Sequence, residues 1–356
     1  MSRPGKLPAG RSNRLGDIDV IYVTVMARAL ISAGHDPGPL LQRYRLPPQL
    51  LSTPGARLSI PRFMRLGHEA ITLTGNPAFG LTFGAHTRFT DMGLAGLAAL
   101  CAPTLGDALV TLIRFERLTS YNSRGQSGYH WNNQGDLEAR FYSISPYNRY
   151  NAFVVDAILA GWLAFLRQLG NLQEPSLLQQ VRIEYPQPLH GSLFETHFSC
   201  PVQFAARDNT LVLLGDIATS PNPLAQPAAY RDLYQRCERE KKAMEAGWSV
   251  VERVRDELTP RLRGQAATMA QVAAALGTTS WGLRRELATQ GFTYRQLVDR
   301  VRSELALDYV RETTLSFAEI GYLLGFANAT GFYRAFRRWS GTNPGAVRTV
   351  ARAEKP

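Results

Sequence analysis

The chain has little of what marks secreted, membrane or disulfide-stabilised proteins. Its three cysteines, Cys101, Cys200 and Cys237, are far apart and odd in number, which argues against a disulfide framework and for a reducing compartment. No uninterrupted apolar run reaches the ~18 residues that span a bilayer. No long apolar segment follows the basic residues near the N-terminus, so no secretion signal is predicted. We therefore expect a cytoplasmic protein with no membrane partner.

Catalytic and metal-binding patterns are also missing. The six histidines are scattered, and the second histidine of a zinc-protease helix does not follow His68 and Glu69. No Gly-x-Ser-x-Gly elbow, phosphate-binding loop or dinucleotide glycine fingerprint occurs between a predicted strand and helix. We therefore expect no enzyme activity, no catalytic residue, no metal site and no cofactor.

What the chain does have is an excess of positive charge. Lysine and arginine number 40 against 29 aspartates and glutamates, a net charge of +11. This balance favours a polyanionic partner, although many basic soluble enzymes share it. With 356 residues, 45% of them hydrophobic, the chain is long enough for two domains with cores of their own.

The C-terminal third contains an internal repeat, residues 268–291 and residues 316–340. Each copy predicts a short helix, a turn at a glycine and a second, basic helix. Placing Gly277 on Gly325 aligns the apolar positions of the two copies, with one extra turn residue in the second. This order of elements is typical of a helix-turn-helix DNA-binding unit. The equivalent positions beyond the turns are Leu283 with Phe332 and Arg285 with Arg334.

Local signals place the helix ends of the repeat. Thr268 with Gln271, and Ser316 with Glu319, have the spacing of capping boxes in front of the first helices. The residues expected to cap the second helices are Thr279 or Ser280, and Asn328. Each glycine stands where a first helix should stop.

Each second helix has an apolar face and a basic face. Leu283 and Leu287 define the core face of one, and Phe332, Phe336 and Trp339 that of the other. The opposite face carries Trp281, Arg284, Arg285, Thr330, Arg334 and Arg337. For Trp281 the alternative is that it packs inside its own domain, but its helical phase favours the outer face.

A series of short motifs runs through the second copy and its tail: Ser316-x-x-Glu319-Ile320, Leu324-Gly325-Phe326, Phe332-x-Arg334-x-Phe336-x-x-Trp339 and Gly341-x-x-Pro344. Together they resemble the DNA-binding domain of the AraC family of bacterial transcription regulators. Gly282, Gly321 and Val347 depart from the family pattern. The resemblance implies an operator or promoter in double-stranded DNA as partner, together with RNA polymerase. It also implies that bases are read by Trp281, Arg284, Arg285, Ala329, Thr330 and Arg334.

A long helix is predicted between the two copies, at residues 293–312. At 1.5 Å per residue, ~20 residues span ~30 Å, close to the ~34 Å between successive major grooves on one face of DNA. One chain is then able to read two adjacent grooves, and a homodimer two half-sites. Arginines away from the base-reading faces, namely Arg300, Arg302, Arg338 and Arg348, are expected to contact phosphates.

The preceding part of the chain predicts an α+β domain, with helices packed on a small antiparallel sheet. Helices are expected at residues 21–33, 39–45, 61–74, on both sides of a break at 102–103, and at 151–169, 228–246 and 248–262. Strands are expected at residues 129–132 and 137–145, joined by a turn, at 181–186, and as a pair at 202–205 and 211–215 joined through 208–209.

This region also carries motifs: Ala33-Gly34-x-Asp36-Pro37, Leu58-x-Ile60-Pro61, Gly75-Asn76-Pro77-Ala78-Phe79-Gly80-Leu81 and Cys200-Pro201-Val202-x-Phe204. They resemble the N-terminal arabinose-binding-type domain of one branch of AraC regulators, which implies a sensing and dimerisation domain. The name does not make arabinose the ligand. The expected partition is a disordered basic tail at 1–19, this domain at 20–246, the DNA-binding domain at 247–350 and a tail at 351–356.

A site for a small-molecule effector is predicted on the hairpin at residues 129–145. Arg140 and Tyr142 share one face of a strand, and a guanidinium beside a phenol suits a small organic acid. The alternative is that both side chains point into water. The aromatic residues around them either line a ligand cavity or form the core: Tyr121, Tyr129, Trp131, Phe141, Tyr142, Tyr147 and Tyr150.

The sequence thus predicts a DNA-binding transcription regulator, an activator located on the nucleoid, with a metabolite-sensing front domain. Two other classes stay open. One is an enzyme-like front domain with a DNA-binding appendage, which turnover of metabolites would reveal. The other is a non-specific architectural DNA-binding protein, which competition by unrelated DNA would reveal.

Overall fold

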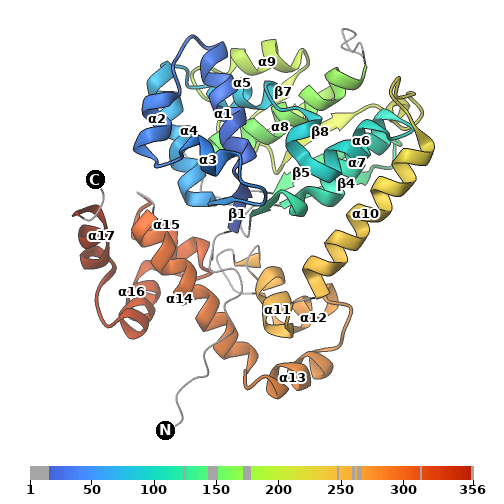
Figure 1. The fold of residues 1–356 in the computed structure, drawn as a ribbon. Coiled ribbons are helices and arrows are strands. Elements are labelled where there is room, and N and C mark those ends of the chain that lie inside the picture. The colour runs from blue at the N-terminus through green and yellow to red at the C-terminus, as the bar shows by residue number, and fades with distance from the viewer. Residues whose placement is uncertain are drawn as a thin grey trace. The chain divides into compact units, whose positions relative to one another are not determined.

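A computed structural model describes residues 16–122, 126–142, 151–170, 178–246, 248–258, 261–262, 267–312 and 315–353. The chain forms two compact units, one of Ile18–Ser249 and one built from Val250–Pro356. Figure 1 shows the elements of both, and each unit is described by itself. Most of the expected tail at 1–19 and the expected domain boundary at Gly247 lie outside the described residues.

The first unit has the predicted α+β fold, and its described elements follow the chain in this order (Figure 1). Its helices are α1 (Ile21–Ser32), α2 (Gly38–Arg43), α3 (Pro48–Leu51), α4 (Ile60–Thr74), α5 (Phe79–Ala85), η1 (Phe89–Met92), α6 (Gly93–Leu100), α7 (Leu105–Phe115), η2 (Glu116–Leu118), α8 (Asn151–Leu169), α9 (Ser192–Phe198), η4 (Gly215–Ala218) and α10 (Pro227–Ala246). Its strands are β1 (Gly16–Asp19), β2 (Arg57–Ser59), β3 (Ser120–Asn122), β4 (Gln126–Trp131), β5 (Leu137–Tyr142), β6 (Leu178–Arg182), β7 (Val202–Gln203) and β8 (Asn209–Leu213).

The main sheet has the strand order β4-β5-β8-β6-β7, and β2-β1-β3 form a smaller one. Strands β4, β5, β8 and β6 pair antiparallel, whereas β7 runs parallel to β6 with Val181 opposite Val202. The prediction that residues 202–205 pair with 211–215 is therefore wrong. All five residues of β8 are buried, as suits a central strand with neighbours on both sides. The turn-like residues 208–209 therefore do not form a hairpin. They end the connection that leads from the edge strand β7 to the central strand β8.

The predicted hairpin between β4 and β5 is present. Its turn is closed by the amide of Asn132, which donates to the carbonyl of Asp136 at 2.9 Å. The side-chain oxygen of Asn132 accepts from the amides of Gln134 and Asp136, both at 2.9 Å, and Gly135 has a φ of 86°. This Asx-type turn fixes the register, with Tyr129 opposite Ala139. The described strand β5 ends at Tyr142, and the predicted continuation at 143–145 lies outside the described residues.

Helix α8 has the predicted bounds and lies in the core. The 18-residue window Ala152–Leu169 has a mean hydropathy of 1.6, so by length and composition it meets the criterion for a membrane span, contrary to the expectation from the sequence. However, 72% of this window is buried within the protein, as expected for the core helix of a globular domain. Helix α7 begins at the predicted cap, because the hydroxyl of Thr104 accepts from the amide of Asp107 at 3.0 Å.

Two glycines let α5, a helix the sequence did not predict, lie close against α8. A Cβ on Gly80 would lie 2.6 Å from the Cβ of Asp156. A Cβ on Gly84 would lie 2.5 Å from the Cβ of Ala160 and 2.6 Å from the carbonyl oxygen of Ala157. These separations are too short for real atoms, so any side chain at either position must push the two helices apart.

We expect Gly84→Ala to lower the free energy of unfolding by about 1–2 kcal/mol, because overpacking outweighs the gain in helix propensity. Urea unfolding followed by circular dichroism measures this effect. The matched control is Gly128→Ala, where the added Cβ meets nothing within 4 Å. Equal stability of the two variants would contradict the packing argument.

The second unit is all helical, as predicted. Its described helices are α11 (Val250–Leu258), α12 (Met269–Ala275), α13 (Ser280–Thr289), α14 (Tyr294–Glu312), α15 (Phe317–Leu323), α16 (Ala329–Ser340) and α17 (Pro344–Ala353). Helices α12 and α13 form the first helix-turn-helix unit and α15 and α16 the second, and α14 joins them. Helix α14 has 19 residues, or about 28 Å at 1.5 Å per residue. Helix α17, which packs on α14, was not predicted.

The predicted caps of the repeat are confirmed. Both capping boxes form, Thr268 with Gln271 and Ser316 with Glu319. Thr279 caps α13 through the amide of Gly282 at 3.0 Å, and Asn328 caps α16 through the amide of Gly331 at 2.8 Å. The turn glycines have positive φ, 67° at Gly277 and 74° at Gly325, which a side chain would strain.

Candidate nucleic-acid interface

Helix α13 has a buried leucine face and an exposed polar face. Leu283 and Leu287 are fully buried, whereas Trp281 is 69% exposed. The guanidinium carbon of Arg285 lies 5.6 Å from the centre of the Trp281 ring, within cation–π range. Arg284 and Arg285 are both exposed. Trp281 therefore does not pack into its own domain, and its ring and the two guanidinium groups form one outward surface.

Helix α16 repeats this division. Phe332 and Phe336 are buried, and Trp339 is half-buried with its ring 6.0 Å from that of Phe326. Thr330, Arg334 and Arg337 are exposed on the other side, and Ala329 is half-buried at the start of the helix. Arg285 on the exposed face of α13 and Arg334 on the exposed face of α16 thus occupy equivalent positions.

The arginines of these faces differ in their ion pairing from several other arginines of the second unit. Among the described residues, the guanidinium groups of Arg284, Arg334 and Arg337 form no ion pair. By contrast, Arg253 pairs with Glu286 at 3.1 Å and Arg255 with Glu304 at 3.1 Å. Exposed arginines without internal carboxylate partners are available to an external anion such as a phosphate, or to a base edge.

Arg302 was expected to contact phosphate, and the structure gives it another role. Its Nε donates to the carbonyl of Leu324 at 2.7 Å and its Nη2 to that of Gly325 at 2.6 Å. Its guanidinium carbon also lies 4.7 Å from the centre of the Phe326 ring. Leu324 is the C-cap of α15, so Arg302 closes the turn of the second helix-turn-helix unit. Helical phase had placed it away from the base-reading face but could not show this partner.

The other expected phosphate contacts are also engaged inside the unit. Arg300 pairs with Glu304 at 3.2 Å, and Arg348 lies 4.2 Å from the centre of the Phe317 ring. Arg338 pairs with Asp299 at 3.2 Å, but its side chain is 64% exposed. A surface pair of this kind is weak and can exchange its partner. Of the four, Arg338 is exposed and the others are half-buried, so Arg338 stays the candidate for a phosphate contact.

Two of the departures from the family pattern have packing reasons. A Cβ on Gly321 would lie 3.1 Å from the Cβ of Phe332, so glycine there lets α15 approach α16. A Cβ on Gly282 would lie 2.8 Å from the hydroxyl of Thr278 and 3.3 Å from that of Thr279, the capping residue of α13. Nothing in the structure explains Val347.

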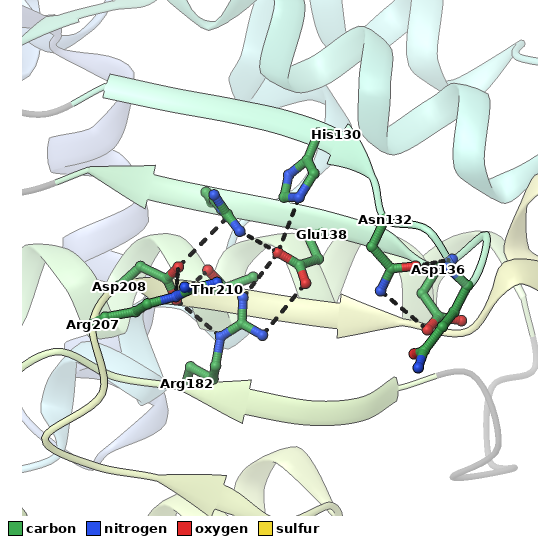
Figure 2. Close-up of polar contacts among 10 residues, drawn as sticks. His130, Asn132, Asp136, Glu138, Arg182, Arg207, Asp208 and Thr210 are labelled. Carbon is green, nitrogen blue, oxygen red and sulfur yellow. Dashed lines mark hydrogen bonds and ion pairs between the residues drawn. The ribbon is translucent and has the colours of Figure 1, made fainter.

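The effector site expected at Arg140 is already occupied by the protein's own carboxylates. Figure 2 shows His130, Glu138, Arg182 and Asp208 close together across β4, β5, β6 and the start of β8. Arg140 donates to Glu138 and lies 3.6 Å from Asp208, while Arg182 bonds the same two carboxylates, each at 2.9 Å.

The ion pairs within this cluster argue against an organic acid at Arg140. Burial raises the pKa of Glu138, but hydrogen bonds from Arg182 and Arg140 outweigh burial and lower this pKa to about 2. Glu138 thus pairs with two guanidinium groups and Asp208 with three, so an added acid would have to displace one of the two carboxylates. The prediction that Arg140 and Tyr142 anchor an organic acid therefore has no support in the geometry.

Those aromatic residues of the hairpin that the structure describes do not form a cavity together. Tyr129 and Trp131 are 37% and 42% exposed, and Tyr142 is half-buried. The side chains of Tyr121, Tyr147 and Tyr150 lie outside the described residues. Phe141 alone of the described members points into the core.

A cavity of ≈ 80 Å³ does exist in the first unit, and Phe141 is one of its walls. The other walls come mainly from α1, α4, α5 and α8, with further residues from β1, η1, α7 and the segment after α7. Sequence reasoning missed it because its lining residues are separated by more than 100 positions. The one local signal was a glutamate, Glu116, directly after the apolar helix α7.

Comparison with known proteins matches both units. The model for the N-terminal arabinose-binding domain of AraC transcription regulators matches residues 34–222, and a helix-turn-helix domain model matches residues 272–349. The ornithine utilization regulator of Pseudomonas aeruginosa is 30% identical over 333 residues, covering 93% of this chain and 96% of that protein. The regulator VirS of Mycobacterium tuberculosis is 25% identical, covering 87% and 90%. The crystal structure of the regulator CdpR from Pseudomonas aeruginosa aligns with a TM-score of 0.45 at 24% identity, covering 92% of this chain and 98% of that one.

Proposed function

Because the chain belongs to the AraC family of transcription regulators, we propose that it binds a specific operator in double-stranded DNA through α13 and α16. Arg285 and Arg334, exposed at equivalent positions of two successive helix-turn-helix units, carry this proposal. Two such helices at the ends of one long helix suit two adjacent major grooves. Trp281, Arg284, Thr330 and Arg337 extend the two faces, and Arg338 supplies a phosphate contact.

The finer parts of the proposal concern regulation. The protein acts as a homodimer on the nucleoid, in the cytoplasm, and activates transcription by contact with RNA polymerase. The N-terminal domain binds a small metabolite that favours the DNA-binding arrangement of the dimer. The relative named for ornithine utilization makes nitrogen-containing metabolites the first candidates.

Footprinting of the purified protein on DNA flanking its own gene tests the proposal. We expect one protected region covering adjacent major grooves, retained in the presence of excess unrelated DNA. Protection lost equally to any competitor DNA would support a non-specific architectural protein instead. Turnover of a metabolite by the purified protein would favour the enzyme-like alternative.

A prediction on domain autonomy follows from the burial pattern of the second unit. Residues 249–356 contain their own core, with Val272, Leu287, Ile320 and Phe336 all buried to 1% exposure or less. We therefore expect this fragment to fold alone and to protect the same bases as the full chain, with lower affinity because one dimer contact surface is missing. Circular dichroism and footprinting of the fragment measure both properties. The matched control is residues 18–249, which should fold and leave the DNA unprotected.

A further inference from the structure

The cavity of the first unit has an unusual combination of apolar walls and a single charge. Most of its described walls are apolar, and they include the rings of Tyr22, Phe63, Phe141 and Trp162. Glu116 is the one formally charged residue among the described lining residues, and no lysine, arginine or histidine accompanies it there. A ligand that enters therefore meets rings and one carboxylate.

Two other polar side chains of the cavity, Tyr22 and Thr87, already have partners. The hydroxyl of Tyr22 lies 2.9 Å from the sulfur of Met92 and 3.3 Å from the hydroxyl of Thr119. The hydroxyl of Thr87 donates to the carbonyl of Gly84 at 2.6 Å. These bonds engage both hydroxyl groups, and the recognition of a charged ligand group falls on Glu116, the one formally charged residue of the described lining.

Glu116 is held in place without an opposite charge in contact. It begins η2, directly after α7, which fixes its backbone against the helical layer. Burial raises its pKa, and the polar groups of nearby Ser127 and the charge of Arg117 oppose this. Within the described part of the chain no ion pair is formed by Glu116. A carboxylate beside an apolar cavity without an ion-pair partner gains most from a ligand that brings a positive charge.

We propose that this cavity is the effector site and that it binds a small organic cation, a primary amine on a short apolar chain, with the ammonium group at Glu116. The proposal rests on the regulatory function proposed above and names the class of its ligand. The apolar chain of the ligand lies against the aromatic rings of the cavity, whose faces also attract a cation.

The volume of the cavity and the charge of its lining narrow the class of ligand further. At the ~10–15 Å³ that one water-sized occupant requires, a cavity of ≈ 80 Å³ has room for a ligand of about six non-hydrogen atoms. An organic acid would place a second negative charge beside Glu116. An α-amino acid such as ornithine would bring a carboxylate for which the described lining has no cationic partner.

Binding of a matched series to the full-length protein tests the proposal. Isoamylamine, isoamyl alcohol and isovalerate share nearly one shape and differ in charge. We expect saturating isoamylamine to raise the Tm by roughly 5 °C, whereas the alcohol, the acid and ornithine have little effect. Isothermal titration calorimetry on the same samples gives the Kd.

Two variants locate the site. Glu116→Gln keeps the shape and removes the charge, so we expect the Kd of isoamylamine to rise roughly thirtyfold or more. Glu195→Gln removes an exposed carboxylate of α9 and should leave this Kd unchanged. Ala157→Leu fills the cavity from α8 and should abolish binding while Glu116 is intact. The Tm of each variant without ligand shows whether it is folded.

The proposal is overturned if isovalerate or isoamyl alcohol binds as tightly as the amine, if Glu116→Gln binds the amine unchanged, or if no amine of the series binds at millimolar concentration. Footprinting of the protein with and without isoamylamine is a separate readout. Specific protection of DNA without amine binding would overturn this inference and leave the proposed function standing. Amine binding without specific DNA protection in either state would support the amine site and overturn the proposed operator binding.

Discussion

Arg334→Ala is expected to weaken binding to the cognate operator by about 1–3 kcal/mol, roughly 5- to 150-fold, and to relax the choice of base at one position. Arg334 is exposed on α16, opposite the buried Phe332 and Phe336, and it forms none of the ion pairs among the described residues. Its guanidinium group is therefore able to donate two hydrogen bonds to a guanine edge. Fluorescence anisotropy titrations against a panel of single-base operator variants measure both effects.

Two further variants separate base reading from general attraction to DNA. Arg285→Ala should have an effect of similar size at a base in the other half of the site, and the two losses should add because the residues are far apart in the repeat. Arg236→Ala removes an equal charge from an exposed position of α10, where Arg236 pairs with Asp232, and should change operator binding little. If Arg334→Ala weakened random DNA as much as the operator, the assigned face would be wrong.

The parts of the fold that the sequence predicts well are those set by short-range chemistry. Both capping boxes and both turn glycines act within one helical turn, so the repeat could be read without knowledge of tertiary structure. The exposed state of Trp281 followed from helical phase alone. Asn132 and Gly135 fixed the β4–β5 hairpin in the same local way.

What the sequence could not predict depends on partners far along the chain. Strand β7 pairs with β6, about 20 residues earlier, because the buried β8 takes the central place in the sheet. Arg140 shares a strand face with Tyr142, as expected, but two of the groups that complete its ion-pair cluster, Arg182 and Asp208, lie about 40 and 70 residues further along the chain. The cavity beside Glu116 exists only after α1, α4, α5 and α8 have packed.

Arg302 is the clearest example of a contact that the sequence could not predict, and its substitution is expected to have a large effect on stability. We expect Arg302→Ala to lower the free energy of unfolding of the DNA-binding domain by about 2–4 kcal/mol. Two charge-assisted hydrogen bonds to Leu324 and Gly325 and the stacking on Phe326 are lost together. The carbonyls at the C-terminal end of α15 then lose their donor, and the turn before the second recognition helix loosens. Thermal unfolding of the full-length variant measures the loss.

The salt dependence of DNA binding distinguishes this role from a phosphate contact. If Arg302 only supports the turn, Arg302→Ala should weaken operator binding but leave the slope of log K against log salt unchanged. Arg302→Lys should restore little stability, because an ammonium group cannot reproduce two fixed donors and a stacked plane. Arg338→Ala is the matched control: its exposed pair with Asp299 contributes at most about 1 kcal/mol, and its loss should lower the slope by about one unit. An Arg302→Ala protein with undiminished stability and a lower slope would show that Arg302 contacts phosphate after all.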